Sequence, residues 1–507
     1  MDPAALAPSW KPYAGSRIKL AAICEIRDAA AAMLRDAGYI AAIEIPEQRI
    51  TDGTIRFDVL MARIVSVRVR GDAGRSEPII ARYLDKLAGQ QVFNRHEAER
   101  YLLLAGDLPG FDVRLTLKSA GAGPGEVVGE VTVARRPAQI DLNVQDYGSR
   151  ELGRWGLLAR GQANGLTGLG DRTSLAFFTT SDFEEQQNLQ VGHEMRIGGE
   201  GLTLSGDLVL SWAEPAIGQP GIRLRSKTLL ATLAARYPFV RRQAENLWGA
   251  AGIDLIDQKV RFNGLPLNRD ELRVAFLRLE ADSVDRASIV RLGGYSAAEP
   301  RWRVAGRIEA RHGLGILGAS KGCGPALSRC LVPGAVPPSR LEGDPTAAVL
   351  RAEAYGEFRP SPKIAISLGA RAQHSGDPLF AFEEYSAGNY TIGRGYDPGS
   401  LLGDSGVGLQ AELRVGTILP RTPRSLAVQP FIFLDAAWVS NQDRLFVLSG
   451  RDRLTSVGGG VRAALGDQAR LDLALAVPLA RAGLQAKRGD PRLLVSLTTS
   501  LWPWSFK

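Results

Sequence analysis

The sequence predicts a mainly β protein: a 16-stranded antiparallel transmembrane β-barrel preceded by two small α+β domains. Three observations lead to this prediction. The 507 residues are 45% hydrophobic, yet the longest stretch without Asp, Glu, Lys or Arg, residues 493–506, is shorter than the ~20 residues of a membrane-spanning helix. Glycine is abundant, with 57 residues where a usual share of ~7% would give far fewer, which indicates many turns. From residue 137 onward, hydrophobic and polar residues alternate with a period of two.

The N-terminal part contains two successive units in which helical and strand patterns follow one another. In the first, apolar residues recur at helical spacing over 21–38, and two alternating strands follow around the Asp52-Gly53 turn. Because no strand pattern precedes this helix, we expect the first α+β domain, residues 1–68, to be N-terminally incomplete.

The second unit repeats the pattern. Residues 77–88 predict one helix, and Asn94 with Glu97 forms a capping box that opens another. Two alternating strands around a Gly-rich turn follow from Phe111. We therefore expect a second α+β domain over residues 69–136.

The remaining residues, 137–507, predict the barrel. Each alternating segment has about ten residues, the length of a tilted strand that crosses a bilayer. The connections 314–345 and 375–404 are the longest, and both fall where the strand count places extracellular loops. The 284–299 connection is too long for a short turn at the other end, so we expect a misplaced strand boundary near it. The sixteen segments are 138–147, 154–163, 170–180, 186–196, 201–213, 226–236, 245–258, 270–283, 300–313, 346–358, 363–374, 405–416, 429–439, 454–466, 469–479 and 492–501.

One carboxylate falls on the inner face of an apolar strand. Over residues 430–439, Trp438 and the aliphatic side chains suit lipid, so Asp435 on the other face points into the lumen. A lone carboxylate in such a strand is costly unless it is paired. In the 375–404 connection, Arg394 lies between two glycines and precedes Tyr396. If this connection folds back into the barrel, Arg394 can bind Asp435 in a bidentate manner. An ordinary solvated arginine in a Gly-rich loop is the alternative.

The cysteines of the 314–345 connection allow two interpretations, a disulfide or two free thiols. Cys323 and Cys330 lie seven residues apart in a Gly- and Pro-rich loop, without the shorter spacing or nearby histidine of a metal site. A loop disulfide in an oxidising compartment is the favoured interpretation, and two free thiols are the alternative. The N-terminal residues contain no signal-peptide pattern, which conflicts with an oxidising compartment.

Several classes of function find no support in the sequence. The net charge of +8 is spread over 62 basic and 54 acidic residues, without the basic patch of a nucleic-acid binder. There is no P-loop, and Gly313-Leu-Gly315-Ile-Leu-Gly318 is not followed by the helix that a dinucleotide site needs. The four histidines lie in unrelated contexts, so no catalytic constellation or metal site is predicted. We expect neither an enzyme nor a cofactor.

The segment around Arg394 carries a resemblance to a known family. The sequence GRGYDPGSLLGDSG, followed by Glu412-Leu-Arg414, resembles the loop-six signature of the two-partner secretion transporters, the haemolysin secretion/activation family. Arg394, Gly395 and Tyr396 match the core of that signature, and Asp435 matches its carboxylate partner in a later strand. Ala437 departs from the Gly that the family often has. The first domain resembles a polypeptide-transport-associated (POTRA) module through Gly38-Tyr39, Pro46-Glu-Gln48 and Asp52-Gly53.

The resemblance implies a bacterial outer-membrane barrel with two periplasmic POTRA-type domains. Its function would be to recognise an unfolded exoprotein, of β-helical haemolysin or adhesin type, and to secrete it through the barrel. The implied partners are this exoprotein and outer-membrane lipid, with no nucleotide and no nucleic acid. It also implies a signal peptide and a first strand upstream of the present start. The alternatives are an outer-membrane protein assembly factor of the same superfamily and a passive porin-like barrel.

Overall fold

The computed structural model describes residues 3–50, 52–88, 92–121, 123–443, 451–483 and 488–502. The chain divides into two compact units. The first contains residues 1–136 with the turns 167–170 and 198–201, and the second contains the rest. Among the described residues, no helix is long and apolar enough to cross a membrane.

The first part of the N-terminal unit pairs a helix with a short hairpin. After η1 (Pro3–Leu6), α1 (Ala7–Trp10) and η2 (Lys11–Tyr13), α2 (Ala21–Asp36) buries its apolar face, formed by Ile23, Ile26, Ala30 and Leu34. This spacing of three and four residues is the helical period of the sequence. Strands β1 (Ala41–Glu44) and β2 (Asp58–Met61) pair antiparallel around the predicted turn.

The second part is a three-stranded sheet with two helices. The helices are α3 (Glu77–Ala88), after η3 (Gly74–Ser76), and α4 (Arg95–Gly106), whose N-cap Asn94 accepts a hydrogen bond from the His96 amide. Their apolar faces form one core with the sheet, which includes Ile79, Tyr83, Leu87, Leu104 and Val131. The sheet order is β3-β5-β4, from β3 (Arg63–Gly71), β5 (Glu126–Arg135) and β4 (Phe111–Ser119). Strand β3 therefore straddles the boundary expected between residues 68 and 69, and it pairs in parallel with β5.

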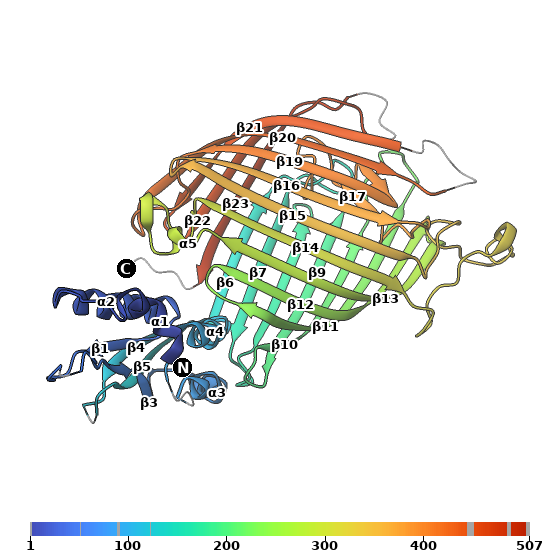
Figure 1. Ribbon diagram of the computed structural model, residues 1–507. Helices are drawn as coiled ribbons and strands as arrows, with labels where there is room; N and C mark the ends of the chain where they lie inside the picture. Colours follow the sequence, from blue (N-terminus) through green and yellow to red (C-terminus); the bar gives the residue numbers. More distant parts are fainter. Residues whose placement is uncertain are drawn as a thin grey trace. The chain divides into compact units, whose positions relative to one another are not determined.

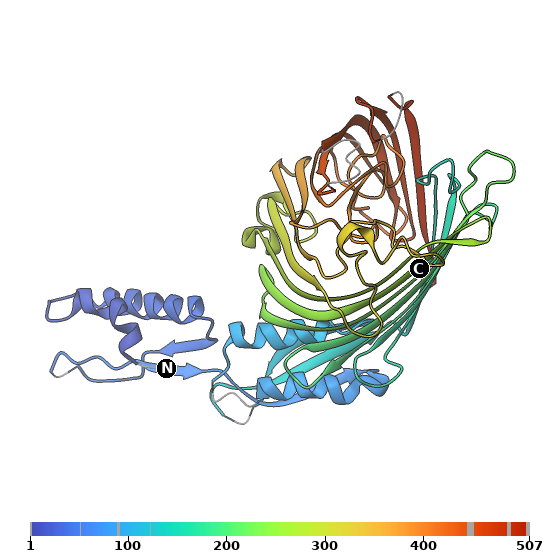
Figure 2. The same cartoon turned by 90° about the vertical axis from the view of Figure 1, so that its right-hand side faces the viewer.

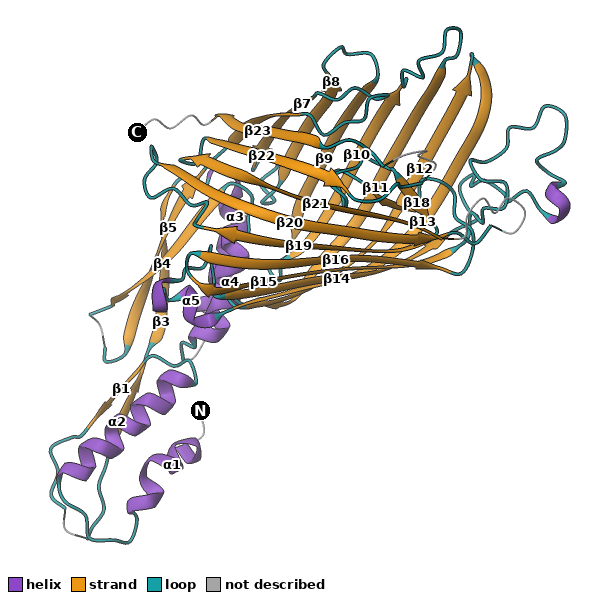
Figure 3. Ribbon diagram, turned by 90° about the horizontal axis from the view of Figure 1, so that it is seen from above, coloured by secondary structure: helices purple, strands orange, loops and turns teal. Residues whose placement is uncertain are grey.

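The second unit is a closed antiparallel barrel of sixteen strands, as predicted (Figure 1). Sheet closure is made by β23 pairing with β6. Figure 3 shows that strands dominate this unit, while the long helices lie in the N-terminal unit. The barrel strands are β6 (Ala138–Gln145), β7 (Gly156–Asn164), β8 (Arg172–Thr180), β9 (Gln186–Ile197), β10 (Leu202–Ala213), β11 (Leu224–Arg241), β12 (Glu245–Phe262), β13 (Leu265–Val284), β14 (Trp302–Gly313), β15 (Ala348–Ser361), β16 (Ile364–Ser375), β19 (Ser405–Val415), β20 (Leu426–Ser440), β21 (Arg451–Leu465), β22 (Ala469–Pro478) and β23 (Arg492–Trp502).

The alternation of the sequence becomes an apolar outside and a polar inside. On β20, Ile432 and Trp438 are 60% and 45% exposed on the outer face, whereas Asp435 is 1% exposed on the inner face. On β22, Leu473 and Leu475 are exposed in the same outward manner. Because successive side chains of a strand point to opposite faces, this pattern leaves arginine and carboxylate side chains to fill the lumen.

The 284–299 connection corrects one expectation. Strand β13 ends at Val284 and β14 begins at Trp302, within two residues of the predicted bounds, so the expected boundary error at this connection was wrong. The connection is long because it contains α5 (Arg286–Ile289), capped by Asp285, and the short turn η4 (Leu292–Gly294).

The two long connections lie at the same end of the barrel, here called the loop end. Loop five, residues 314–347, joins β14 to β15 and contains η5 (Pro325–Leu327). Loop six, residues 376–404, joins β16 to β19 and contains a small hairpin of β17 (Tyr385–Ala387) and β18 (Leu401–Gly403), which the sequence did not predict. Figure 2 shows these segments, coloured yellow to orange, in front of and within the barrel opening.

Candidate functional site

Loop six folds into the barrel, and its tip is buried against the inner wall. Tyr396 and Ile392 are each 2% exposed, and they form one apolar cluster with Ala437 on β20 and Leu454 on β21. This packing holds the tip, residues 390–397, against the wall formed by β19 to β23. The signature residues Arg394, Gly395 and Tyr396 therefore lie inside the lumen.

The structure brings Arg394 and Asp435 together. The Arg394 Nη2 and Nε atoms donate to Asp435 Oδ1 and Oδ2 at 2.8 and 3.0 Å, and the Arg394 backbone amide donates to Oδ2 at 3.0 Å. Three donors on one buried carboxylate satisfy its charge and fix the orientation of the guanidinium. Because a buried carboxylate without a partner is unfavourable, this pairing explains how Asp435 is tolerated on an apolar strand.

Two further residues complete the Arg394 site. Arg394 Nη1 donates to Glu412 Oε2 at 2.9 Å, and the guanidinium carbon lies 3.6 Å from the centroid of the Phe433 ring. Glu412 and Phe433 face inward from the neighbouring strands β19 and β20, where they pair in register. Sequence reasoning quoted Glu412 within the motif but gave it no role. Glu412 faces the lumen from β19, as Asp435 does from β20, and the alternation along β19 was the signal that could have identified it.

Gly395 fits a narrow space between the loop and the wall. A Cβ atom at this position would lie 2.9 Å from Ser456 Cβ and 3.0 Å from the Pro478 nitrogen. The Gly395 amide donates to Ser456 Oγ at 3.3 Å. The close approach of the loop backbone to β21 and β22 therefore requires glycine.

The Tyr396 hydroxyl joins loop six to the ends of two strands. It lies 2.8 Å from the carbonyl oxygen of Thr455 and 2.7 Å from that of Ala480. The amides of the same two residues point to the hydroxyl oxygen at 3.3 and 3.2 Å. One phenol thus satisfies backbone groups of both β21 and the segment after β22.

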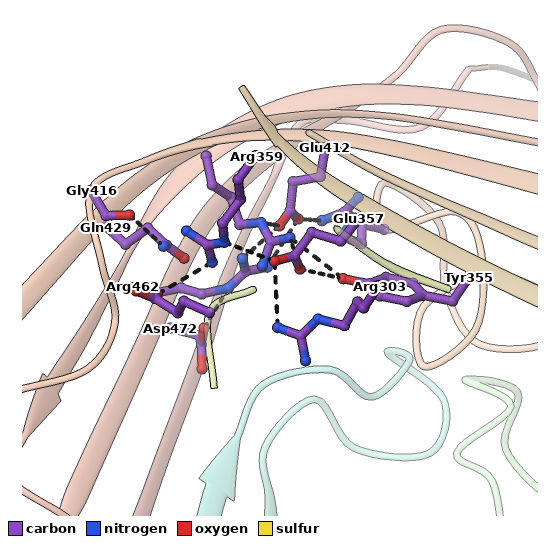
Figure 4. A network of polar contacts seen from close by, with 12 residues as sticks. Arg303, Tyr355, Glu357, Arg359, Glu412, Gly416, Gln429, Arg462 and Asp472 are labelled. Carbon is purple, nitrogen blue, oxygen red and sulfur yellow. Dashed lines mark hydrogen bonds and ion pairs between the residues drawn. The ribbon is translucent and has the colours of Figure 1, made fainter. Parts of the chain in front are cut away.

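A larger network of lumenal charges continues from Glu412 (Figure 4). Arg462 donates to Glu412 and to Asp472, at 2.9 and 3.0 Å. Arg414 lies 3.5 Å from Glu412 and donates to Glu357 at 2.7 Å. Glu357, whose side chain is fully buried, also accepts from Tyr355, Arg359 and Arg303. The loop-six site is therefore one end of a connected set of inward-facing charges.

Loops five and six meet in a second polar cluster. Arg340 of loop five binds three carboxylates: Glu384 at 2.8 Å, Asp443 at 2.5 Å and both oxygens of Asp404. Burial raises the pKa of Glu384 to about 7, and the neighbouring Asp404 and Asp443 add to this rise while Arg340 opposes it. The sequence did not predict this cluster, since its members come from three separate connections.

The cysteines of loop five are joined. Cys323 and Cys330 form a disulfide, and Cys24 is free and exposed. The disulfide closes a short segment of loop five around η5.

Comparison with known proteins assigns the chain to a family. Residues 127–463 match the model of the family described as haemolysin secretion/activation protein ShlB/FhaC/HecB. The chain belongs to this family. Residues 1–61 match the ShlB-type POTRA domain. Membership of the family confirms an outer-membrane barrel with its N-terminal unit in the periplasm.

Curated relatives match a part of the chain. The heme/hemopexin transporter protein HuxB of Haemophilus influenzae strain 86-028NP is 26% identical over 198 residues, which is 38% of this chain and 34% of that protein. HuxB of strain KW20 / Rd is 25% identical over the same share. The chain therefore matches about one third of the length of these relatives.

Solved structures share the fold at low identity. CdiB from Escherichia coli superposes with a TM-score of 0.77 at 16% identity, over 99% of this chain and 88% of that chain. CdiB from Acinetobacter baumannii gives a TM-score of 0.68 at 16% identity, over 98% and 85%. BamA from Haemophilus ducreyi lacking POTRA domains 1–3 gives 0.55 at 13% identity, over 98% and 97%. The sequence prediction of a barrel preceded by small α+β domains is confirmed.

Proposed function

We propose that this protein is an outer-membrane translocation pore that secretes an unfolded exoprotein through its barrel by two-partner secretion. The observation that carries the proposal is the position of Arg394, held inside the lumen between Asp435 and Glu412. The match of residues 127–463 to the haemolysin secretion/activation family and of residues 1–61 to a POTRA domain supports this proposal over a passive porin.

The proposed division of the chain follows the sequence: POTRA-type domains over residues 1–68 and 69–136, and the transporter barrel over 137–507. Strand β3, which begins at Arg63, contributes to the sheet of the second domain. The edge strand β4 of that sheet and the hairpin of β1 and β2 offer backbone donors and acceptors to an extended segment. Such a segment can bind by β-strand addition, which depends little on its sequence.

The proposed partner is a secreted exoprotein of β-helical haemolysin or adhesin type that reaches the periplasm unfolded. Because the periplasm supplies no ATP, folding of this exoprotein outside the cell would make the transport directional. The outward face of the barrel is lined by exposed aliphatic side chains such as Leu277 and Leu493, and we propose that it contacts outer-membrane lipid.

The proposal is tested by replacing Arg394 with Ala in cells that also express the proposed partner, an exoprotein of β-helical haemolysin or adhesin type. We expect exoprotein in the culture medium to fall to background, while the variant barrel inserts into the outer membrane in normal amount. Heat-dependent migration in gels checks that the barrel folds. Normal secretion by this variant would show that the loop-six site is not needed.

The same cells distinguish secretion from barrel assembly. Deletion of this protein should leave the amounts of other outer-membrane proteins unchanged while the exoprotein is lost from the medium. A general fall in outer-membrane proteins would instead indicate an assembly factor and contradict the proposal.

A further inference from the structure

A cavity of about 670 Å³ lies in the lumen beside the tip of loop six. Loop six contributes Tyr390, Thr391 and Ile392 to its lining, and the inner wall of β11 to β16 forms the other side. The tip itself is bound to the opposite wall through Asp435, Thr455 and, by way of Asp397, Arg492 of β23. The cavity therefore lies between the bound tip and the β11–β16 wall.

The charged lining of this cavity consists of partly exposed ion pairs of both signs. Arg307 lies 2.8 Å from Glu353, with side chains 40% and 38% exposed, and Arg236 lies 2.8 Å from Glu280. Exposed pairs of this kind contribute little free energy, so they can exchange partners at low cost. A wall of weakly held charges without net sign suits an extended polypeptide that moves past, because it offers polar partners without selecting one sequence.

Toward the loop end, the same wall is in tight contact with loop six. Phe380 of loop six packs against Ile256, Leu272 and Val274. The cavity that this part of loop six, the end of loop five and β13 to β15 enclose is about 10 Å³, too little for more than one water molecule. On β14, Arg311 lies four residues closer to the loop end than Arg307, a rise of about 13 Å.

Glu383 holds this contact with buried charges, here called the Glu383 anchor. Glu383 Oε1 accepts from Arg311 at 2.8 Å, and Oε2 accepts from Arg311 at 3.0 Å and from Arg351 at 3.1 Å. The Glu383 backbone carbonyl accepts from Arg351 and Gln373. Arg311 and Glu383 are only 5% and 7% exposed in their side chains. Breaking a buried pair leaves an uncompensated charge, so this anchor resists separation far more than the exposed pairs below it.

We propose that an exported segment passes along the β11–β16 wall and that the Glu383 anchor is the gate at the outer end of this path. Arg394 would keep the loop-six tip on the opposite wall while the gate opens. This inference rests on the proposed function, because it names the route that the secreted chain takes. It makes Glu383, with Arg311 and Arg351, a set of positioning residues that act separately from the Arg394 site.

Thiol labelling of intact cells tests the route without any cargo. Ala305 lines the cavity from β14, and Ser496 faces the lumen from β23 on the opposite wall. Each is replaced by Cys in a Cys24→Ser background and exposed from outside to a membrane-impermeant, positively charged methanethiosulfonate. We expect Glu383→Gln to raise the labelling rate of the cysteine at 305 at least tenfold and to leave the cysteine at 496 unchanged. Glu383→Asp, which keeps the charge, should label at close to the rate of the parent.

Two results would overturn the inference. An unchanged rate at position 305 would show that Glu383 does not close this path, and an equal rise at 496 would show that the whole loop is released instead. If Glu383→Gln does not fold, Arg351→Met weakens the anchor from the strand side, because it removes two of the hydrogen bonds to Glu383, and it must give a difference between the two cysteines in the same direction. Labelling reports on the gate and exoprotein in the medium reports on the function, so failure of one is separate from failure of the other.

Discussion

The guanidinium of Arg394 lies 3.6 Å from the centroid of the Phe433 ring while it binds Asp435 through two nitrogen atoms. Lysine can reproduce neither the planar two-point contact nor the stacking. We expect Arg394→Lys to reduce secretion at least tenfold, nearly as far as Arg394→Ala does. Exoprotein in the medium, normalised to the amount of inserted barrel, measures the effect.

Replacing Phe433 separates the two contributions. Phe433→Leu removes the stacking and keeps the ion pair, so we expect a smaller loss of secretion than from Arg394→Lys. A lysine variant that secretes at the parental level would show that positive charge alone suffices.

Gly395 predicts a steric effect at the loop tip. In Gly395→Ala, the new methyl group would meet Ser456 and the backbone of Pro478, and overpacking of this kind costs roughly 1–3 kcal/mol. We expect the tip to leave the wall for part of the time. Planar-bilayer recordings should then show a larger and noisier conductance than the parent.

A second glycine of loop six supplies the control. A Cβ atom at Gly376 would meet no atom within 4 Å, so Gly376→Ala should leave the conductance unchanged. Equal effects of the two substitutions would contradict a specific steric role for Gly395.

Removal of the Cys323–Cys330 disulfide should destabilise loop five and leave the barrel intact. Closing a loop of this length stabilises it by about 2.5 kcal/mol in the chain-entropy account. Because both cysteines lie in loop five, we expect Cys323→Ser with Cys330→Ser to make this loop sensitive to external protease while the barrel keeps its heat-dependent migration. A loss of barrel stability would show that the disulfide acts beyond its own loop.

The barrel could be predicted because it depends on a local pattern. The alternation of apolar and polar residues along each strand predicts which side chains face lipid and which face the lumen. On β20 this pattern correctly predicts that Asp435 faces the lumen. The contact between Arg394 and Asp435 could be predicted because strand alternation identified Asp435 and the family signature identified Arg394.

The rest depends on how loops fold into the lumen, which alternation does not encode. Glu383 binds residues of three barrel strands, and Arg340 binds residues of two other connections, so no spacing along the chain marks either residue. The alternation of residues 58–71 is continuous, so the sequence predicted one strand there. The structure has two, which are separated at Ala62: β2 pairs with β1, and β3 joins a different sheet by pairing with β5.

The cluster around Arg340 predicts a pH effect on the contact between loops five and six. In this contact the Glu384 carboxyl, with a pKa of about 7, faces Arg340, Asp404 and Asp443; released into water, it returns to its ordinary value near 4.5. The contact therefore binds a proton that the released loop does not bind. It is favoured below pH 4.5 and weakens as the pH rises from 4.5 to 7, by up to about tenfold per unit, before levelling off.

Protease sensitivity of loop five in the purified protein, measured from pH 5 to 8, should rise with pH and level off above 7. Glu384→Gln cannot ionise, so we expect it to keep the low-pH protection and to flatten the profile. Asp377, like Glu384, belongs to loop six, but it is exposed and lies outside the cluster. Asp377→Asn should therefore leave the parental profile unchanged. A profile that stays as steep in Glu384→Gln as in the parent would assign the pH dependence to another group, because only the titration of Glu384 distinguishes the two proteins.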